Sequence, residues 1–515
     1  MVVPELKPWR AAVPHVQRIA GAVRPCLARL AAVARTSGSR PVKTWQFSAG
    51  AALAGLALAS GVAATAGPWE GNGQRTAERE RAAGQEGSGG ADHADGRAAR
   101  HEGPRPAPSA VPVLTGLDGA AQTVITKNDP PGEQPLADVL APLLDVPELG
   151  GSHTAAVVDV ATGRRLYDAG GATARTPAST TKIATAVAAL SALGPDHRLT
   201  TRAALEPDTR ELVLVGGGDP TLTAHRTTGG WAGLRALADR TAAALKKRGI
   251  RQVTLSYDTT LYTGPALHPI GVNDNIAPVS ALMADEGRTD GSTSGPVTRV
   301  ADPAADATAK FAGFLADSGI RTTAPGPSKA TKRSITLASV SSPPLSALVE
   351  RMLTNSDNDI AEALARHTAL ASGERASFEG GGRAIGARLR KLGLPTAGAS
   401  FRDGSGLDRA DRLTADLLTS LLGEAGSARR PGLRPVLTGL PVAGFTGTLA
   451  ARYTDGAAGV VRAKTGTLTG VNTLAGTVVD KHGRLLAFAF LASDTTSPLD
   501  AQAALDRAAT ALADW

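Results

Sequence analysis

Two hairpin patterns, one at each end of the ordered part of the sequence, constrain the fold of this chain most. The stretch 153–160 is apolar with β-branched residues, turns at 161–163 and returns at 164–167. Near the C-terminus, 476–479 and 485–491 flank a short polar turn. Such runs around turns are typical of antiparallel strand pairs. Because helical patterns lie between the two pairs, we predict an α+β fold with one antiparallel sheet flanked by helices.

The middle of the chain has a different pattern. Short apolar runs such as 212–215 and 253–255 alternate with helical patches such as 231–244. This alternation predicts a smaller α/β subdomain inserted into the main domain. The expected bounds are 134–205 and 338–515 for the main domain and 206–337 for the inserted subdomain.

The net charge of +8 is concentrated at the N-terminus. Residues 1–43 hold eight Lys or Arg and a single acid, Glu5, so the rest of the chain is nearly neutral. A basic face for nucleic acid is therefore not expected on the folded part, and we predict no nucleic-acid partner.

An uncharged stretch, 44–67, follows this basic segment. It is long enough to cross a bilayer, and the one-sided basic flank favours a cytoplasmic 1–43 and export of everything after it. Its Ala-rich and Gly-rich composition and the sequence Ala64-Thr65-Ala66 fit a cleaved signal peptide equally well. Two interpretations stand: a single-pass anchor in the cell membrane, or secretion after cleavage.

Residues 68–133 are rich in Gly, Ala, Pro and charged residues and have almost no aliphatic periodicity. This composition predicts a disordered linker. The only cysteine, Cys26, precedes the exported part, so no disulfide framework is expected there. No His pair has metal-ligand spacing and no phosphate-binding loop occurs, so we expect neither a metal nor a cofactor.

Three short motifs occur once each and in order: Ser179-Thr180-Thr181-Lys182, Ser356-Asp357-Asn358 and Lys464-Thr465-Gly466. Pro177 and a following apolar stripe place Ser179 near a helix N-terminus. Lys182 then lies one turn along the same face, within reach of the serine oxygen. A lysine activates a serine only when neutral, and burial beside a second cation would lower its pKa.

The sequence around the other two motifs also predicts the elements on which they lie. Ser356 and Asn358 lie in a predicted turn between helices at 345–353 and 360–364. Residues 461–467 predict an edge strand, with Gly466 where a backbone approaches a ligand. A substrate peptide could pair along such a strand.

From about Leu136 to Trp515 the chain resembles the D-alanyl-D-alanine carboxypeptidase/endopeptidase family of low-molecular-mass penicillin-binding proteins. The stretches 212–222, 277–282 and 403–407 add to the three motifs, and β-lactamases lack them. The resemblance implies a penicillin-binding protein/β-lactamase-like transpeptidase fold. It also implies peptidoglycan stem peptides as substrates and β-lactam antibiotics as inhibitors.

The resemblance further implies a role for each site residue. Ser179 is acylated, with Lys182 as general base. Ser356 and Lys464 pass the proton to the departing D-Ala. The implied substrate-binding residues are Asn358, Thr465, Gly466 and Thr467, and the implied oxyanion hole consists of the N–H groups of Ser179 and Thr467.

Two other functions share these motifs. A secreted β-lactamase is disfavoured by the long insertion between the first two motifs, and a non-catalytic wall protein would carry a damaged motif, which is not seen. Carboxypeptidase and endopeptidase activities stay open, since only the leaving group differs. The insertion is also shorter than in larger relatives, which suggests that an accessory subdomain is reduced or missing.

Overall fold

The structure is a computed structural model that describes residues 135–323, 326–453 and 456–515. The predicted basic segment 1–43, the anchor or signal peptide 44–67 and the linker 68–133 lie outside the described residues. Within the part that is described, no helix combines the length and the hydropathy needed to cross a membrane.

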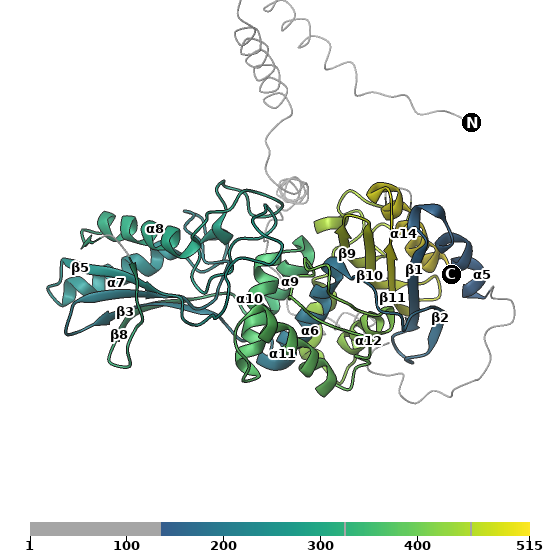
Figure 1. Cartoon of the computed structure of the whole chain (residues 1–515), viewed down its shortest axis with the longest axis horizontal. Coiled ribbons are helices and arrows are strands. Elements are labelled where there is room, and N and C mark those ends of the chain that lie inside the picture. Colours follow the sequence, from purple (N-terminus) through teal and green to yellow (C-terminus); the bar gives the residue numbers. More distant parts are fainter. Residues whose placement is uncertain (1–134, 324–325, 454–455) are drawn as a thin grey trace, which may run out of the picture. The chain divides into compact units, whose positions relative to one another are not determined.

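The main domain contains an antiparallel five-stranded sheet in the order β2-β1-β11-β10-β9 (Figure 1). The strands are β1 (Ser152–Asp159), β2 (Arg165–Ala169), β9 (Arg462–Leu468), β10 (Val471–Val479) and β11 (Leu485–Ser493). Both hairpin predictions are confirmed, since β1 pairs with β2 and β10 with β11. β1 also pairs with β11 along its whole length, so the two ends of the domain meet at the centre of the sheet.

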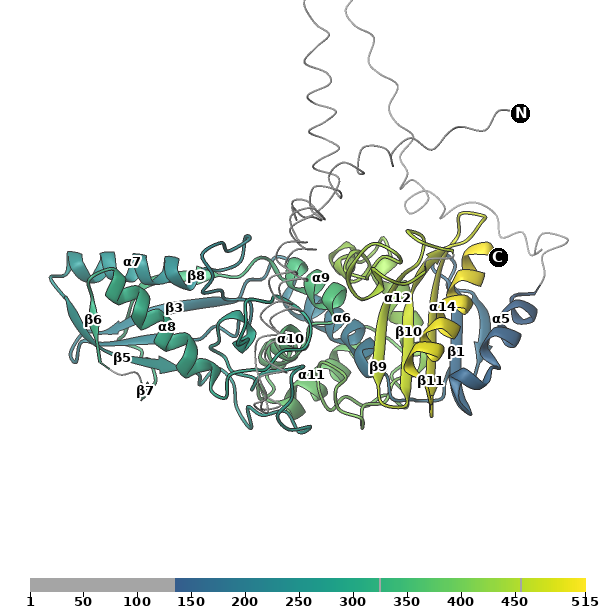
Figure 2. The same ribbon diagram turned by 90° about the horizontal axis from the view of Figure 1, so that it is seen from above.

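Helices cover both faces of this sheet (Figure 2). The helices α5 (Leu136–Leu144) and α14 (Pro498–Asp514) pack on one face, and α6 (Thr181–Leu193) and α12 (Ala415–Gly426) pack on the other. Alternate residues of β11 serve the two cores: Phe488 and Phe490 face α5 and α14, whereas Ala489 and Leu491 face α6 and α12. Because both faces are covered, β11 is buried over most of its length.

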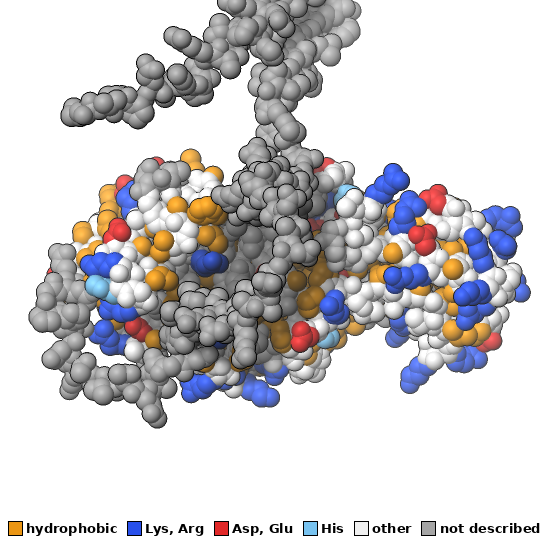
Figure 3. Space-filling view, turned by 180° about the vertical axis from the view of Figure 1, so that it is seen from behind, with side chains coloured by type: hydrophobic (Ala, Val, Ile, Leu, Met, Phe, Trp, Pro, Cys, Tyr) orange, Lys and Arg blue, Asp and Glu red, His pale blue; other side chains and the backbone are white. Residues whose placement is uncertain are grey.

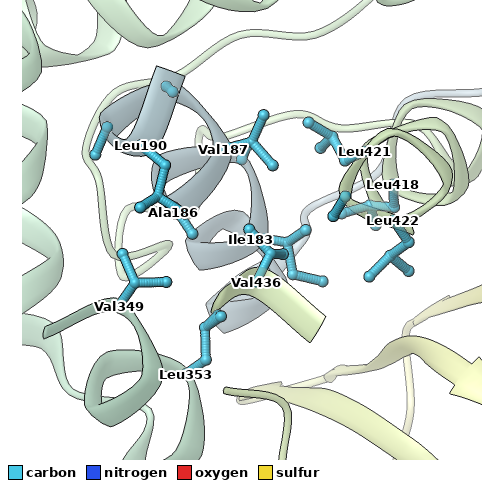
Figure 4. Close-up of a cluster of buried hydrophobic side chains, with 14 of the residues drawn as sticks. Ile183, Ala186, Val187, Leu190, Val349, Leu353, Leu418, Leu421, Leu422 and Val436 are labelled. Carbon is cyan, nitrogen blue, oxygen red and sulfur yellow. The ribbon is translucent and has the colours of Figure 1, made fainter. Parts of the chain in front are cut away.

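Helix α6 lies at the centre of the helical layer (Figure 4). The sequence predicts one apolar stripe, but every residue from Thr181 to Leu190 is buried. The reason is that α6 is surrounded by α9 (Leu345–Asn355), α10 (Asn358–Ala371), α11 (Phe378–Lys391) and α12. The helix that follows Ser179 is thus held by packing on every side.

The inserted subdomain has its own sheet, in the order β6-β5-β4-β3-β8, with β7 also pairing β5. Its strands are β3 (Thr200–Glu206), β4 (Glu211–Val215), β5 (Gln252–Asp258), β6 (Arg321–Thr322), β7 (Gly326–Pro327) and β8 (Ile335–Ser341). Two helices, α7 (Leu234–Lys247) and α8 (Pro303–Asp317), pack on it. The sheet extends beyond the expected 206–337 at both ends, because β3 pairs with β8 as well as with β4.

The surface of the inserted subdomain carries many Lys and Arg side chains with Asp and Glu among them (Figure 3). Lys246 and Lys247 lie in the last turn of α7, where a cation complements the helix dipole. Exposed ion pairs such as Arg235–Asp317 account for others. The remaining short elements are η2 (Pro147–Leu149), η3 (Ala178–Thr180), η4 (Asp285–Gly287), η5 (Pro431–Leu433), α13 (Pro435–Thr438) and η6 (Gly447–Leu449).

Candidate active site

Ser179 lies in the short turn η3, directly before α6. The preceding residue, Ala178, has a φ of 47°, an unusual conformation for a residue with a side chain. Two glycines pack against this turn, because a Cβ at Gly406 would overlap the carbonyl oxygen of Ala178, and a Cβ at Gly466 would lie 2.8 Å from that of Pro177. The strained turn is therefore fixed from two sides by segments distant in the sequence.

Lys182 is fully buried one turn after Ser179. Its Nζ lies 3.0 Å from Ser179 Oγ, 2.6 Å from Asn358 Oδ1 and 2.7 Å from the carbonyl oxygen of Ser405. Burial lowers the pKa of Lys182 to about 8, although nearby carboxylates, Asp403 foremost, oppose the shift. When the amine is neutral, its two N–H bonds to Asn358 and Ser405 leave the lone pair for Ser179.

Ser356 and Asn358 lie at the junction of α9 and α10, as the sequence predicts. Ser356 ends α9 in a left-handed conformation, with φ 58° and ψ 39°. Asp357 caps α10 by accepting a hydrogen bond from the N–H of Ile360 at 3.0 Å. Asn358 also donates from Nδ2 to the carbonyl oxygen of Asn275 at 2.9 Å, a contact with the inserted subdomain.

Lys464 lies on the edge strand β9 and is fully buried. Its Nζ donates to the carbonyl oxygen of Thr465 at 2.7 Å. Burial lowers the pKa of Lys464 well below its ordinary value, and the positive charges of Lys182 and Arg452 add to the effect. The site therefore holds two buried lysines, and burial lowers the pKa of both.

Gly466 has a packing role that the sequence does not reveal. The sequence suggests that it lets a ligand approach the backbone, but a Cβ at this position would meet Thr473 Oγ1, Pro177 and Ala178. The glycine thus lets β9 approach the turn that carries Ser179. The neighbouring hydroxyls are more accessible: Thr465 Oγ1 lies 3.0 Å from Thr448 Oγ1, and Thr467 is exposed.

A pocket of about 350 Å³ joins the three motifs. The predicted residues on its wall are Ser179, Ser356, Asn358, Thr465 and Thr467. Lys182, Lys464 and Gly466 do not line this pocket, but each lies next to a residue that does or contacts one. All eight predicted site residues are thus brought into one region.

The inserted subdomain supplies a further part of the pocket wall that the motifs do not reveal. It contributes Asn275, Arg288, Arg299 and the stretch 294–296. Arg299 is anchored to Asp359 at 2.7 Å, directly after the Ser356-Asp357-Asn358 motif. These residues belong to no recognised motif, and only the folding of the insertion back onto α10 places them here.

Two groups of buried side chains in the described ranges have the composition of a metal site: His268, Glu362 and Asp403, and Glu286, Asp357 and Asp359. Protein donors already engage both. Glu286 pairs with Arg288 at 2.8 Å, and the Asp403 carboxylate accepts several backbone N–H groups. Their geometry is that of ion-pair and hydrogen-bond networks supporting the pocket.

The fold and this pocket bring together a serine hydroxyl, a buried lysine amine and the free edge of β9, an arrangement typical of serine peptidases that use a lysine. A family model described as the D-Ala-D-Ala carboxypeptidase 3 (S13) family matches residues 136–296 and 289–512. The chain belongs to this family.

Individual relatives agree with the family match. Carboxypeptidase DacB of Mycolicibacterium smegmatis is 38% identical over 438 residues, which cover 81% of this chain and 91% of the relative. A D-alanyl-D-alanine carboxypeptidase of an Actinomadura species is 31% identical over 444 residues, 69% of this chain and 80% of the relative. The crystal structure of penicillin binding protein 4 from Haemophilus influenzae shares the fold, with a TM-score of 0.59 and 22% identity over 73% of this chain and 98% of that one.

Proposed function

We propose that this protein is a serine D-alanyl-D-alanine carboxypeptidase that hydrolyses peptidoglycan stem peptides through an acyl-enzyme on Ser179. The observation that carries the proposal is the Lys182 amine, which lies 3.0 Å from Ser179 Oγ while two fixed acceptors orient it. Membership of the carboxypeptidase family supports the same reaction.

In the first step neutral Lys182 takes the proton of Ser179 Oγ as the oxygen attacks the carbonyl carbon of the penultimate D-Ala. A C–O bond forms and the carbonyl oxygen gains negative charge. The backbone N–H groups of Ser179 and Thr467 are our candidates for stabilising this charge.

In the second half of acylation the C–N bond to the terminal D-Ala breaks. The departing amine needs a proton, and we assign its delivery to Ser356 and Lys464. Burial lowers the pKa of Lys464 well below its ordinary value, and an amine with a lowered pKa gives up its proton more readily than an ordinary lysine. Water then attacks the ester, which releases the shortened peptide and restores Ser179.

Substrate binding is assigned to the groups on the open side of the pocket. Thr465 and Thr467 would hold the terminal carboxylate, and Asn358 would hold a backbone amide. The peptide would lie antiparallel along the free edge of β9, which is the last strand of its sheet. A β-lactam that acylates Ser179 would act as an inhibitor, and the Haemophilus protein of similar fold has been solved with a β-lactam.

We also propose that the protein acts outside the cytoplasm, either anchored to the cell membrane through 44–67 or secreted after cleavage. The support is the one-sided basic charge of 1–43 beside an uncharged stretch. Cell fractionation, with N-terminal sequencing of the mature protein, distinguishes the two arrangements.

The test of the proposed activity is intact-mass spectrometry of the full-length protein after incubation with a penicillin. We expect one lasting adduct, which is lost in Ser179→Ala and kept in the matched control Ser191→Ala on α6, the helix that follows Ser179. Rapid penicillin hydrolysis without an adduct would instead indicate a β-lactamase, and neither adduct nor hydrolysis would indicate a non-catalytic wall protein. Release of D-Ala from a pentapeptide, compared with cleavage of a cross-linked dimer, separates carboxypeptidase from endopeptidase activity.

A further inference from the structure

His268 is a histidine of the inserted subdomain that lies inside the main domain's network. Its side chain is fully buried, and its Nε2 lies 2.9 Å from Asp403 Oδ2. The backbone N–H of Ile270 donates to its Nδ1 at 3.2 Å, so the ring proton lies on Nε2 and points at Asp403. The edge of the ring packs against Phe378, with centroids 5.0 Å apart. The imidazole is thus held in one orientation, in which its Nε2–H donates to the Asp403 carboxylate.

Asp403 is the centre of this network. Besides His268, its carboxylate accepts hydrogen bonds from the N–H groups of Ser405 at 3.0 Å, Gly406 at 2.6 Å and Asp408 at 2.7 Å. Such charge-assisted bonds are strong and short, so the carboxylate fixes the path of the backbone around it. Movement of Asp403 would therefore move the whole segment 403–407.

This segment carries one of the groups that hold Lys182. The carbonyl oxygen of Ser405 accepts a hydrogen bond from Lys182 Nζ at 2.7 Å, deep in the protein. Glu362 supports the same peptide by accepting from the N–H groups of Gly404 at 2.9 Å and Ser405 at 3.0 Å. The position of the lysine amine thus depends on the position of segment 403–407.

We infer that His268 is a positioning residue for Lys182: it orients Asp403, which holds the Ser405 carbonyl that directs the lysine amine toward Ser179. This inference rests on the proposed role of Lys182 as the general base. It assigns the inserted subdomain a part in the reaction beyond lining the pocket.

Segment 403–407, which the His268–Asp403 hydrogen bond supports, also contacts the turn that carries Ser179. Gly406 lies against the carbonyl oxygen of Ala178, next to Ser179, where no side chain fits. A shift of segment 403–407 would therefore disturb both the base and the turn that carries the serine. A displacement of about 1 Å in such a site costs on the order of 100-fold in rate.

The test uses two substitutions of similar length in the full-length protein. His268→Gln keeps an N–H donor at the position of Nε2, whereas His268→Met has no donor. We expect His268→Met to slow acylation by a penicillin about 10- to 100-fold, the range that loss of one hydrogen bond to a charged group allows. His268→Gln should restore the rate to within about threefold of the wild-type protein.

The readout separates positioning from general damage to the fold. Because His268 does not line the pocket, the acylation rate constant should fall while the dissociation constant of the non-covalent complex stays the same. His225→Met, on the surface of the same subdomain, serves as the control and should change neither. Equal acylation rate constants in the Met and Gln variants, or a fall confined to binding, would overturn the inference.

A double-mutant cycle with Asp403→Asn tests the route through Asp403 directly. If His268 acts through Asp403, adding His268→Gln or His268→Met to Asp403→Asn should cost little beyond the single change. Strictly additive losses would refute this route. Failure of the proposed function is recognised separately, because then wild-type protein would form no adduct on Ser179 at all.

Discussion

The core of the inserted subdomain and the pocket region of the main domain bury different kinds of side chain. Between its sheet and its two helices the inserted subdomain buries apolar residues such as Leu214, Leu255 and Phe311. The main domain fully buries Lys182 and Lys464 among its apolar clusters. Burying a lysine amine costs free energy unless the amine is paired or hydrogen-bonded. We therefore expect Lys182 and Lys464 to lower the stability of the main domain. The inserted subdomain supplies a stable frame from which loops reach the pocket.

The largest effect that this comparison predicts is for Lys464→Met. Removal of the buried amine should slow acylation by a penicillin about 10²- to 10⁴-fold, the range for loss of an acid–base group. The melting temperature should stay the same or rise, since a buried polar amine is replaced by an apolar side chain of similar size. Stopped-flow acylation and calorimetry measure the two, and Lys481→Met in an exposed turn is the control. Normal acylation, or a large fall in melting temperature, would contradict the comparison.

Gly466→Ala should give the next largest effect. The new methyl group would overlap Thr473 Oγ1 and press on the turn before Ser179, so β9 must move away from the serine. We expect acylation to slow about 100-fold, as for other small displacements of reacting groups. The matched control is Gly151→Ala, where a Cβ meets no atom within 4 Å. An unchanged acylation rate would show that the approach of β9 to η3 is not required.

The pH dependence of the acylation rate constant should follow the protonation state of Lys182. Its pKa is lowered to about 8, and only the neutral amine accepts the serine proton. The rate constant should therefore rise about tenfold per pH unit below pH 8 and level off above it. Because Asp403 is the charge that raises the pKa of Lys182 most, Asp403→Asn should move the rising part of the pH–rate profile to lower pH. An unchanged pH–rate profile in Asp403→Asn would argue against Lys182 as the base.

The smallest effect on acylation is expected for Phe311→Ala in α8. Phe311 is fully buried in the core of the inserted subdomain, and its truncation should destabilise the protein by about 3–5 kcal/mol. The acylation rate constant of the folded protein should change less than about twofold, because that core touches no reacting group. Phe445→Ala, at a side chain that is 67% exposed, should alter neither quantity. Loss of acylation in a folded Phe311→Ala variant would show that the core of the inserted subdomain does influence the acylation rate constant.

The local patterns around the motifs were sufficient to place the main elements. Apolar runs on either side of turns predicted β1, β11 and the end of β10, and the spacing of Ser179 and Lys182 placed both on one helical turn. The resemblance to the carboxypeptidase family, which rests on short stretches such as 403–407, agrees with the family match. These features are local, because hydrogen-bonding period and side-chain spacing act over a few residues.

Other features were decided only by the tertiary structure. The strained turn at Ala178 persists because distant Gly406 and Gly466 pack against it, a contact that the sequence does not reveal. Asn275, Arg299 and His268 reach the site only because the inserted subdomain folds back onto α10 and segment 403–407. The sequence by itself therefore determined which three motifs meet in the site. Tertiary packing determined their protonation and direction, because burial and long-range hydrogen bonds depend on segments that are far apart in the chain.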